Sequence, residues 1–168
     1  YGDIVNADVA ILAGTNTTAN HPVASSFFKQ AKRRGTRLVV VDPRAERIAE
    51  HADLFCQIRP GTDVAFYNSL LHVLCRDGLL DRDYIATQTE GFDELETLVA
   101  DDYSPDQAAA ICGAPAEQIE AIRQEIERAP LKPVDYSKHQ LGGFDVASSE
   151  AIHSQNVTAH PAMVRFLE

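Results

Sequence analysis

Short apolar runs alternate with amphipathic segments along the first part of the chain. The runs at residues 8–14, 38–41 and 54–58 are typical of strands buried on both faces. Between the first two runs, residues 22–34 place Val23, Phe27, Phe28 and Ala31 on one helical face. Residues 44–51 form the predicted second helix. Short strands joined by helices predict a parallel βαβαβ half-sheet with right-handed crossovers.

Proline and glycine mark the ends of these predicted helices. Pro22 fits the first position of a helix and Gly35 ends it, while residues 15–21 are expected to form a loop. Asp42 and Pro43 suit the N-cap and first position of the next helix. The turn at residues 60–63 opens a third helix, which ends at Gly78 and carries the apolar side chains Val64, Leu70, Leu71, Val73 and Leu74.

The rest of the chain divides into a helical run and a tail. Helices are predicted at residues 82–88, 92–100, 105–111 and 115–128, with Pro105 and Pro115 at two of the starts. Residues 130–168 lack long apolar periodicity and read as an irregular tail. The expected domain therefore covers residues 1–129, and residues 130–168 have uncertain structure.

Composition narrows the functional classes. The chain has 168 residues, 45% of them hydrophobic and 24% charged, which is ordinary for one globular domain. Its net charge of −10 argues against a nucleic-acid partner, and the lack of a long apolar run argues against direct membrane contact. Three cysteines without a close pair do not make a disulfide framework, so a cytoplasmic setting is expected. The early start of the first apolar run, after Tyr1, suggests a piece of a longer chain.

Three loops follow the carboxyl ends of the predicted strands, where open parallel sheets bind ligands. They span residues 14–20, 42–44 and 59–63. Each loop opens a helix and so brings free N–H groups and a partial positive charge. Gly14 permits close backbone approach and Asn16 can donate to phosphate. Asp42 can accept from ribose hydroxyls, Arg44 can pair with phosphate, and Asp63 can accept from the guanine edge.

Plainer interpretations remain beside this one. Asp42, Thr62 and Asp63 can each serve only as helix caps. The loops contain neither G-x-G-x-x-G nor a P-loop motif, which disfavours a flavodoxin-like NAD or FMN binder. The acidic segment 77–106, in which Arg82 is the one basic residue, is typical of a solvated helical face. A free-standing nucleotide-binding or protein-interaction module that uses this face is the alternative.

Several segments resemble the molybdopterin-guanine-dinucleotide oxidoreductases, and especially the catalytic (alpha) subunits of formate dehydrogenases. Asn16-Thr17-Thr18 followed by Asn20-His21-Pro22 favours formate dehydrogenase over nitrate and dimethyl-sulfoxide reductases. The resemblance covers about residues 3–129, carried by residues 6–23, 31–44, 49–53, 58–63, 89–92, 103–105 and 111–113. It implies a three-layer αβα, Rossmann-like domain that grips one guanine dinucleotide arm of a molybdenum or tungsten cofactor.

The resemblance also implies the parent's chemistry and the residues that hold its cofactor. The parent would interconvert formate and carbon dioxide with a bis-molybdopterin guanine dinucleotide and a 4Fe-4S cluster that this chain does not ligate. Its partners would be the remaining domains of the catalytic subunit and electron-transfer iron–sulfur or flavin subunits. The residues assigned to the dinucleotide are Gly14, Asn16, Thr17, His21, Asp42, Pro43, Arg44, Gly61, Thr62 and Asp63.

Two departures from the family limit what this chain is expected to do. The family's metal-ligating cysteine or selenocysteine, with its histidine, would precede Tyr1, so the chain alone is predicted to be inactive. The segment after Pro130 shows no match to the family's glycine-rich, histidine-containing loop. We interpret Cys56, Cys75 and Cys112 as core residues. His72 reads as a histidine at the edge of the core, and His139, His153 and His160 lack metal-ligand spacing.

Overall fold

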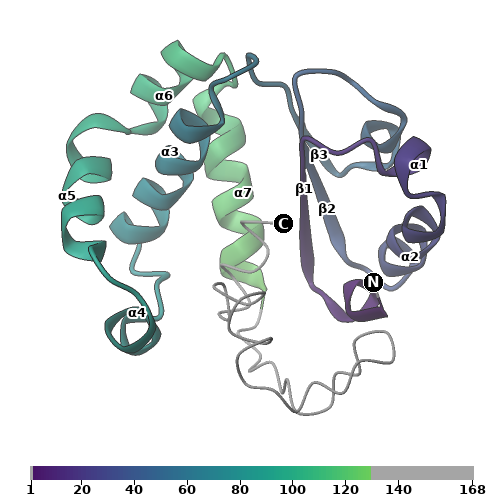
Figure 1. Ribbon diagram of the computed structural model, residues 1–168, viewed down its shortest axis with the longest axis horizontal. Helices are drawn as coiled ribbons and strands as arrows, with labels where there is room; N and C mark the ends of the chain where they lie inside the picture. Colours follow the sequence, from purple (N-terminus) through teal and green to yellow (C-terminus); the bar gives the residue numbers. More distant parts are fainter. Residues whose placement is uncertain (1, 130–168) are drawn as a thin grey trace. The chain divides into compact units, whose positions relative to one another are not determined.

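Three parallel strands in the order β1-β2-β3 form the sheet (Figure 1). The computed structural model describes residues 2–129, which belong to one compact unit. The predicted parallel α/β half-sheet followed by helices is confirmed. Its elements in chain order are η1 (Gly2–Asn6), β1 (Val9–Ala13), α1 (Thr17–Asn20), α2 (Pro22–Arg33), β2 (Arg37–Val41), η2 (Arg47–His51), β3 (Leu54–Cys56), α3 (Asp63–Arg76), α4 (Arg82–Gln88), α5 (Phe92–Asp102), α6 (Pro105–Cys112) and α7 (Ala116–Arg128).

The strands end side by side because their registers coincide. Ala13 pairs with Val41, and Val41 pairs with Cys56. These are the last residues of β1, β2 and β3. The segments that follow the three strands therefore leave the sheet at one edge.

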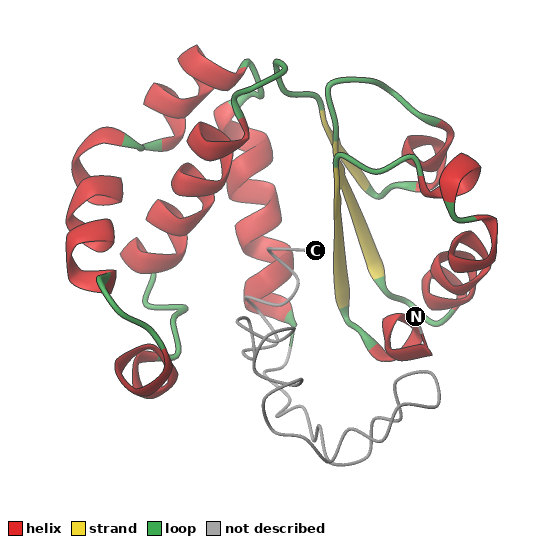
Figure 2. Cartoon of the chain, viewed as in Figure 1, coloured by secondary structure: helices red, strands yellow, loops and turns green. Residues whose placement is uncertain are grey.

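One face of the sheet packs against α2 and η2 (Figure 2). Leu12 and Val40 point to this face, where Phe28 and Ile48 bury their side chains against them. Alternation along a strand sends the intervening residues to the opposite face. Phe28 and Ala31, which the sequence places on one face of the first helix, are both buried.

The other face of the sheet adjoins the helical run. Helix α7 contacts β3, and Gln118 on α7 donates its Nε2 to the Phe55 carbonyl at 3.2 Å. Helix α3 packs against α5, α6 and α7. Phe66 on α3 and Ile122 on α7 are both fully buried. These helices enclose a second apolar core.

The predicted helix at residues 44–51 is wrong in its first half. The Asp42 carboxylate accepts a hydrogen bond from the Arg44 amide at 2.8 Å, which makes a turn and not an N-cap. Glu46 then has extended backbone angles, and only the 3-10 helix η2 follows, Arg47–His51. The Asp42 carboxylate binds the Arg44 amide and so stabilises a turn in place of the first turn of the predicted helix.

Two valines that the sequence groups with the apolar residues of their helices lie on the surface. Val23 is 71% exposed and Val64 is 68% exposed, each in the first turn of its helix. In each helix the buried residues form one stripe, which comprises Ala24, Ser25, Phe28 and Ala31 in α2 and Ala65, Phe66, Ser69, Leu70, Val73 and Leu74 in α3. At 3.6 residues per turn, Val23 and Val64 point away from the centre of that stripe. The expected loop at residues 15–21 also contains the single-turn helix α1.

The structure agrees with the plainer interpretations of other residues. Asp83, Glu90, Asp93 and Asp101 of the acidic segment are exposed. His72 is partly buried, and its Nδ1 lies 2.8 Å from the Val99 carbonyl. The tail and its three histidines lie outside the described residues. Among the helices within residues 2–129, none combines the length and apolar character that a membrane span needs.

Asp53 fastens the start of β2 to α2, and its removal is expected to lower stability in a pH-dependent way. Its Oδ2 accepts from the Leu38 amide at 2.8 Å, and its Oδ1 lies 3.0 Å from Arg37 and 3.2 Å from Lys32. Burial raises the pKa of Asp53, but this hydrogen bond and the two cations outweigh it, so the pKa lies below its usual value. A carboxylate with a lowered pKa in the folded state stabilises above its unfolded pKa of about 3.9, and less as the pH falls through the folded value.

We therefore expect Asp53→Ala to lower the free energy of unfolding by about 1–3 kcal/mol at pH 7. Urea unfolding at pH 7 and at progressively lower pH measures the effect, which should shrink once the pH falls below about 4. Glu90→Ala removes an exposed carboxylate in a loop and serves as the control. A deficit that persisted undiminished in acid would contradict the role assigned to the Asp53 charge.

Candidate functional site

The candidate site lies at the carboxyl edge of the sheet, where the strand ladder continues one residue beyond the strands. The Gly14 amide donates to the Val41 carbonyl at 2.9 Å, and the Asp42 amide donates to the Cys56 carbonyl at 3.2 Å. Gly14 and Asp42 are therefore neighbours at this edge. The structure brings the first two predicted loops together as the parallel sheet requires.

The first loop is held by its own polar side chains. The Thr15 and Thr17 hydroxyls lie 3.1 Å apart, and the Thr18 hydroxyl donates to Asn16 Oδ1 at 3.2 Å. Thr17 is only 3% exposed. Gly14 has a φ of +56°, a conformation that favours glycine. Thr17 therefore shapes this loop from within, whereas the Asn16 amide group faces the second loop.

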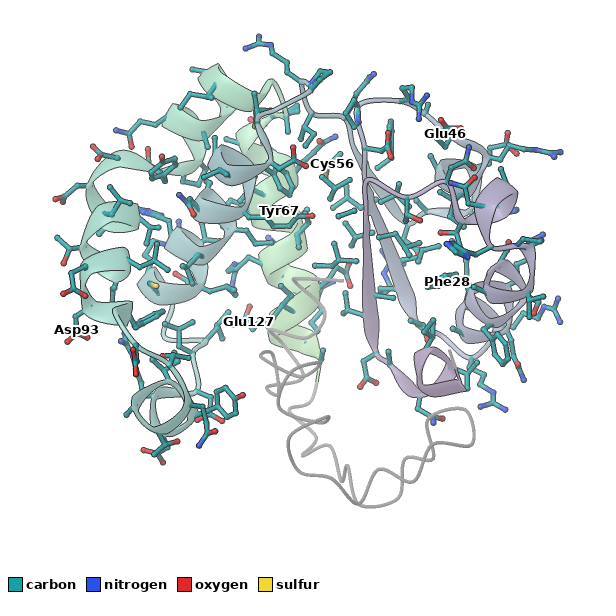
Figure 3. The ribbon with its side chains drawn as sticks, in the orientation of Figure 1. Phe28, Glu46, Cys56, Tyr67, Asp93 and Glu127 are labelled. Atoms are coloured by element: carbon teal, nitrogen blue, oxygen red, sulfur yellow. The ribbon has the colours of Figure 1, made fainter. Side chains whose placement is uncertain are left out.

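Glu46 connects the first and second loops, a contact that sequence reasoning missed. Its Oε2 accepts from Asn16 Nδ2 at 2.8 Å, and its Oε1 lies 3.0 Å from Arg44 Nη2. Figure 3 labels Glu46 close to α1 and η2. The available signal was a carboxylate on the same loop as the candidate phosphate-binding arginine.

Asp42 and Pro43 begin the second loop, and hydrogen bonds hold both residues in place. Asp42 is 4% exposed, and one of its carboxylate oxygens is bound to the Arg44 amide. Gln57, just after β3, donates its Nε2 to the Pro43 carbonyl at 2.9 Å. This bond joins the second loop to the segment that leads into the third.

The third loop is held to the end of α6 by Arg59, whereas Gly61 and Asp63 are exposed. Arg59 donates through Nη1 to the carbonyls of Ala110 and Ile111 at 2.9 and 3.0 Å, so the guanidinium covers the C-terminal end of α6. Thr62 is the N-cap of α3, but its hydroxyl donates to the Arg59 carbonyl at 2.6 Å and does not cap the helix. Asp63 is an exposed residue in the first turn of α3.

Gly61 and His21 lie at the N-termini of α3 and α2. Gly61 has a φ of +78°, which permits the turn into α3. His21 is the exposed N-cap residue of α2, and its carbonyl accepts from the Ser25 amide. The first-turn N–H groups of both helices have no intrahelical carbonyl to bind. Two predicted site residues thus flank sets of backbone donors at the same edge of the sheet.

The residues at this edge fit a phosphorylated nucleoside. Arg44 and Asn16 are donors suited to phosphate oxygens, whereas Asp42 and Asp63 are acceptors suited to hydroxyl and ring N–H groups. Arg44 is 78% exposed at its side chain and so is accessible. Direct contacts connect the first and second loops, but the hydrogen bonds of Thr62 stay within its own loop. The donor and acceptor types are therefore arranged in a row along the edge and not in one cluster.

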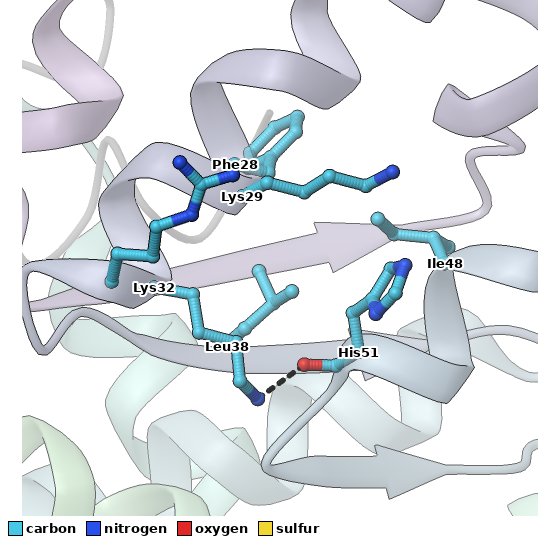
Figure 4. Close-up of a pocket in the computed structure, with 7 residues that line it drawn as sticks. Phe28, Lys29, Lys32, Leu38, Ile48 and His51 are labelled. Carbon is cyan, nitrogen blue, oxygen red and sulfur yellow. Dashed lines mark hydrogen bonds between the residues drawn. The ribbon is translucent and has the colours of Figure 1, made fainter.

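A separate cavity of about 220 Å³ lies away from this edge (Figure 4). Phe28, Leu38 and Ile48 form its apolar wall, and Lys29 and Arg33 stand at its rim. Leu38 lies near the start of β2, at the end of the sheet opposite to Val41. None of the predicted site residues lines this cavity.

The cysteines fit the core interpretation. Cys56 and Cys112 are fully buried, and Cys75 is partly buried. Burial and the neighbouring Cys112 raise the pKa of Cys56 to about 12. Within residues 2–129, no three histidine, cysteine or carboxylate side chains gather as metal ligands would. The part of the chain that the structure describes therefore shows no metal centre of its own.

A sequence model described as "Molybdopterin oxidoreductase" matches residues 1–163. The chain belongs to the molybdopterin oxidoreductase family. This confirms the family to which the sequence segments pointed. The match also extends beyond Pro130, into the segment where sequence reasoning found no resemblance.

Individual relatives agree with the family. The alpha subunit of F420-dependent formate dehydrogenase 1 from Methanococcus maripaludis is 38% identical over 117 residues, 70% of this chain and 17% of the relative. Formate dehydrogenase H from Escherichia coli is 32% identical over 70% of this chain and 16% of the relative. A nitrate reductase from Symbiobacterium thermophilum is 36% identical over 74% of this chain and 18% of the relative.

A solved structure shows the same fold. Acetylene hydratase from Pelobacter acetylenicus superposes with a TM-score of 0.66 and 28% sequence identity, over 75% of this chain and 17% of that one. The chain spans about a sixth of the length of these relatives. The matched region is thus one part of proteins that are much longer.

Proposed function

We propose that this domain holds one guanine dinucleotide arm of a molybdenum or tungsten pterin cofactor in a formate dehydrogenase-like oxidoreductase. One observation carries the proposal. In a chain of the molybdopterin oxidoreductase family, the in-register ends of three parallel strands lead into loops that carry amide and guanidinium donors and carboxylate acceptors along a single sheet edge. Open parallel sheets bind nucleotides at such an edge.

The residues divide the dinucleotide between them. Gly14 and Asn16, beside the N-terminus of α2, bind the phosphate side together with Arg44. Asp42 and Pro43 belong to the second loop, where the other carboxylate oxygen of Asp42 accepts from ribose hydroxyls. Gly61, Thr62 and Asp63 receive the guanine, whose adjacent N1–H and N2–H groups match the Asp63 carboxylate.

The domain contributes binding and orientation, and the reaction takes place elsewhere in the parent enzyme. The bound cofactor would supply the metal that exchanges electrons as formate and carbon dioxide interconvert. The metal ligand, the 4Fe-4S cluster and the electron-transfer partner would come from other domains or subunits. We accordingly propose that the present chain alone is inactive.

The guanine assignment is tested by calorimetric titration of the chain with GDP and, separately, with ADP. We expect GDP to bind more tightly, because Asp63 accepts from guanine and would repel the acceptor nitrogen of adenine. Asp63→Asn should weaken GDP binding roughly ten- to a hundredfold, which corresponds to losing a charge-assisted hydrogen-bond pair.

Asp93→Asn is the matched control, because Asp93 is also an exposed carboxylate in the first turn of a helix. It lies on α5, away from the sheet edge, and should leave GDP affinity unchanged. Equal affinities for ADP and GDP, or a GDP affinity that does not respond to Asp63→Asn, would contradict the assignment of guanine to Asp63.

A further inference from the structure

The Glu46 carboxylate occupies the two side-chain donors of the candidate phosphate site. Its Oε2 holds the Asn16 amide at 2.8 Å, and its Oε1 holds the Arg44 guanidinium at 3.0 Å. The Glu46 side chain is 19% exposed, whereas that of Arg44 is 78% exposed. The carboxylate therefore lies between the two loops, with the arginine on its outer side.

A carboxylate and a phosphate compete for such donors. Both are oxygen anions that accept charge-assisted hydrogen bonds from guanidinium and amide groups. While Glu46 binds Arg44 and Asn16, an arriving phosphate must either displace the carboxylate or remain close to its negative charge. Either course weakens the binding of the phosphate.

The carboxylate is not needed for the turn that carries it. Glu46 is the N-cap residue of η2, but its side chain makes no capping hydrogen bond. Its amide donates to the Arg44 carbonyl at 2.9 Å, and its carbonyl accepts from the Ala49 amide at 2.8 Å. The backbone thus forms the turn, and the side chain can rotate away without breaking it.

We propose that Glu46 is an internal competitor for the phosphate, a side chain that holds the anion-binding donors until a phosphorylated ligand displaces it. The inference rests on the proposed function, because it concerns the same sheet edge. It adds a residue that regulates the affinity of this site for phosphate. The carboxylate lowers the affinity of the site for phosphate until the ligand's phosphate takes over Arg44 and Asn16.

Glu46→Gln tests the proposal by calorimetric titration of the chain with inorganic pyrophosphate, GDP and guanosine. Glutamine has the same shape, and its carbonyl still accepts from Asn16, but it no longer pairs with Arg44 as an ion. We expect pyrophosphate and GDP to bind about two- to fivefold more tightly to the variant, the size of a partly exposed ion pair. Guanosine, which has no phosphate, should bind equally to both proteins.

Two further variants show whether the gain in phosphate affinity depends on the contact between Glu46 and Arg44. Glu50→Gln removes the same charge from an exposed position on η2 and should leave pyrophosphate affinity nearly unchanged. Adding Arg44→Gln to Glu46→Gln should abolish the gain, because the freed guanidinium is its source.

The results separate this inference from the proposed function. Pyrophosphate affinity that Glu46→Gln leaves equal or lowers overturns the inference, as does failure of both proteins to bind pyrophosphate. Equal affinities for GDP and ADP in each protein, both raised by Glu46→Gln, would support the competitor role while overturning the guanine assignment. A preference for GDP over ADP, together with a pyrophosphate affinity that does not respond to Glu46→Gln, would support the guanine assignment and overturn the competitor role.

Discussion

Replacing Phe66 by alanine is expected to lower the free energy of unfolding by about 3–5 kcal/mol. Phe66 lies on α3 with no exposed surface, among the helices that cover the second face of the sheet. Its ring meets the Tyr67 ring edge-on at a centroid distance of 5.3 Å. Truncation removes this contact and leaves a cavity that close-packed helices cannot fully fill.

Val64→Ala is the matched control, since it shortens an apolar side chain on the same helix. Val64 is 68% exposed, so the change should alter stability by no more than about 0.5 kcal/mol. Denaturant titration followed by circular dichroism gives both values. A loss below about 1 kcal/mol for Phe66→Ala would contradict the close packing of α3.

Cys56 is expected to react with iodoacetamide about a thousandfold more slowly than an unfolded cysteine at pH 8. The thiolate is the reactive form, and roughly a quarter of an ordinary thiol is ionised at that pH. Burial, assisted by Cys112, raises the pKa of Cys56 to about 12, which leaves about one thiolate in ten thousand. Figure 3 labels Cys56 at the end of β3, and full burial slows the reagent further.

Cys75 provides an internal reference in the same experiment. Burial, with the nearby Glu96, raises the pKa of Cys75 to about 11 while Arg82 opposes the shift, and the side chain is only partly buried. It should therefore label faster than Cys56 in the native chain, whereas the two should label equally in urea. Peptide mass spectrometry follows each site. Labelling of native Cys56 as fast as Cys75 would show that the sheet edge opens easily.

Helix and strand positions were largely predictable because their signals are local. The run Leu38-Val39-Val40-Val41 is short, apolar and rich in β-branched residues, which favours a buried strand, and it forms β2. Ser104 and Pro105 form the start of α6 with a capping box between Ser104 and Gln107. Such signals act over a few residues and need no distant partner.

Residues at the sheet edge were less predictable, because their neighbours there come from other parts of the chain. Asp42 suited an N-cap by its position before Pro43, but its carboxylate instead makes a turn with the Arg44 amide. Val64 was grouped with the apolar side chains of its helix, but it is 68% exposed because it lies on a different face of α3 from the buried residues. The apolar residues of a helix do not by themselves show which of its faces packs against the rest of the chain.

The sequence by itself determined the parallel half-sheet, the family and the three loops that leave the strand ends. Apolar runs, helix boundaries and family motifs each depend on residues that are close together in the sequence. Only the tertiary structure decided that Glu46 lies between Asn16 and Arg44, a contact across 30 residues of chain. That contact depends on the register between β1 and β2, which brings the two loops together at one edge. Side-chain pairing between loops is therefore fixed by the sheet and cannot be read from either loop alone.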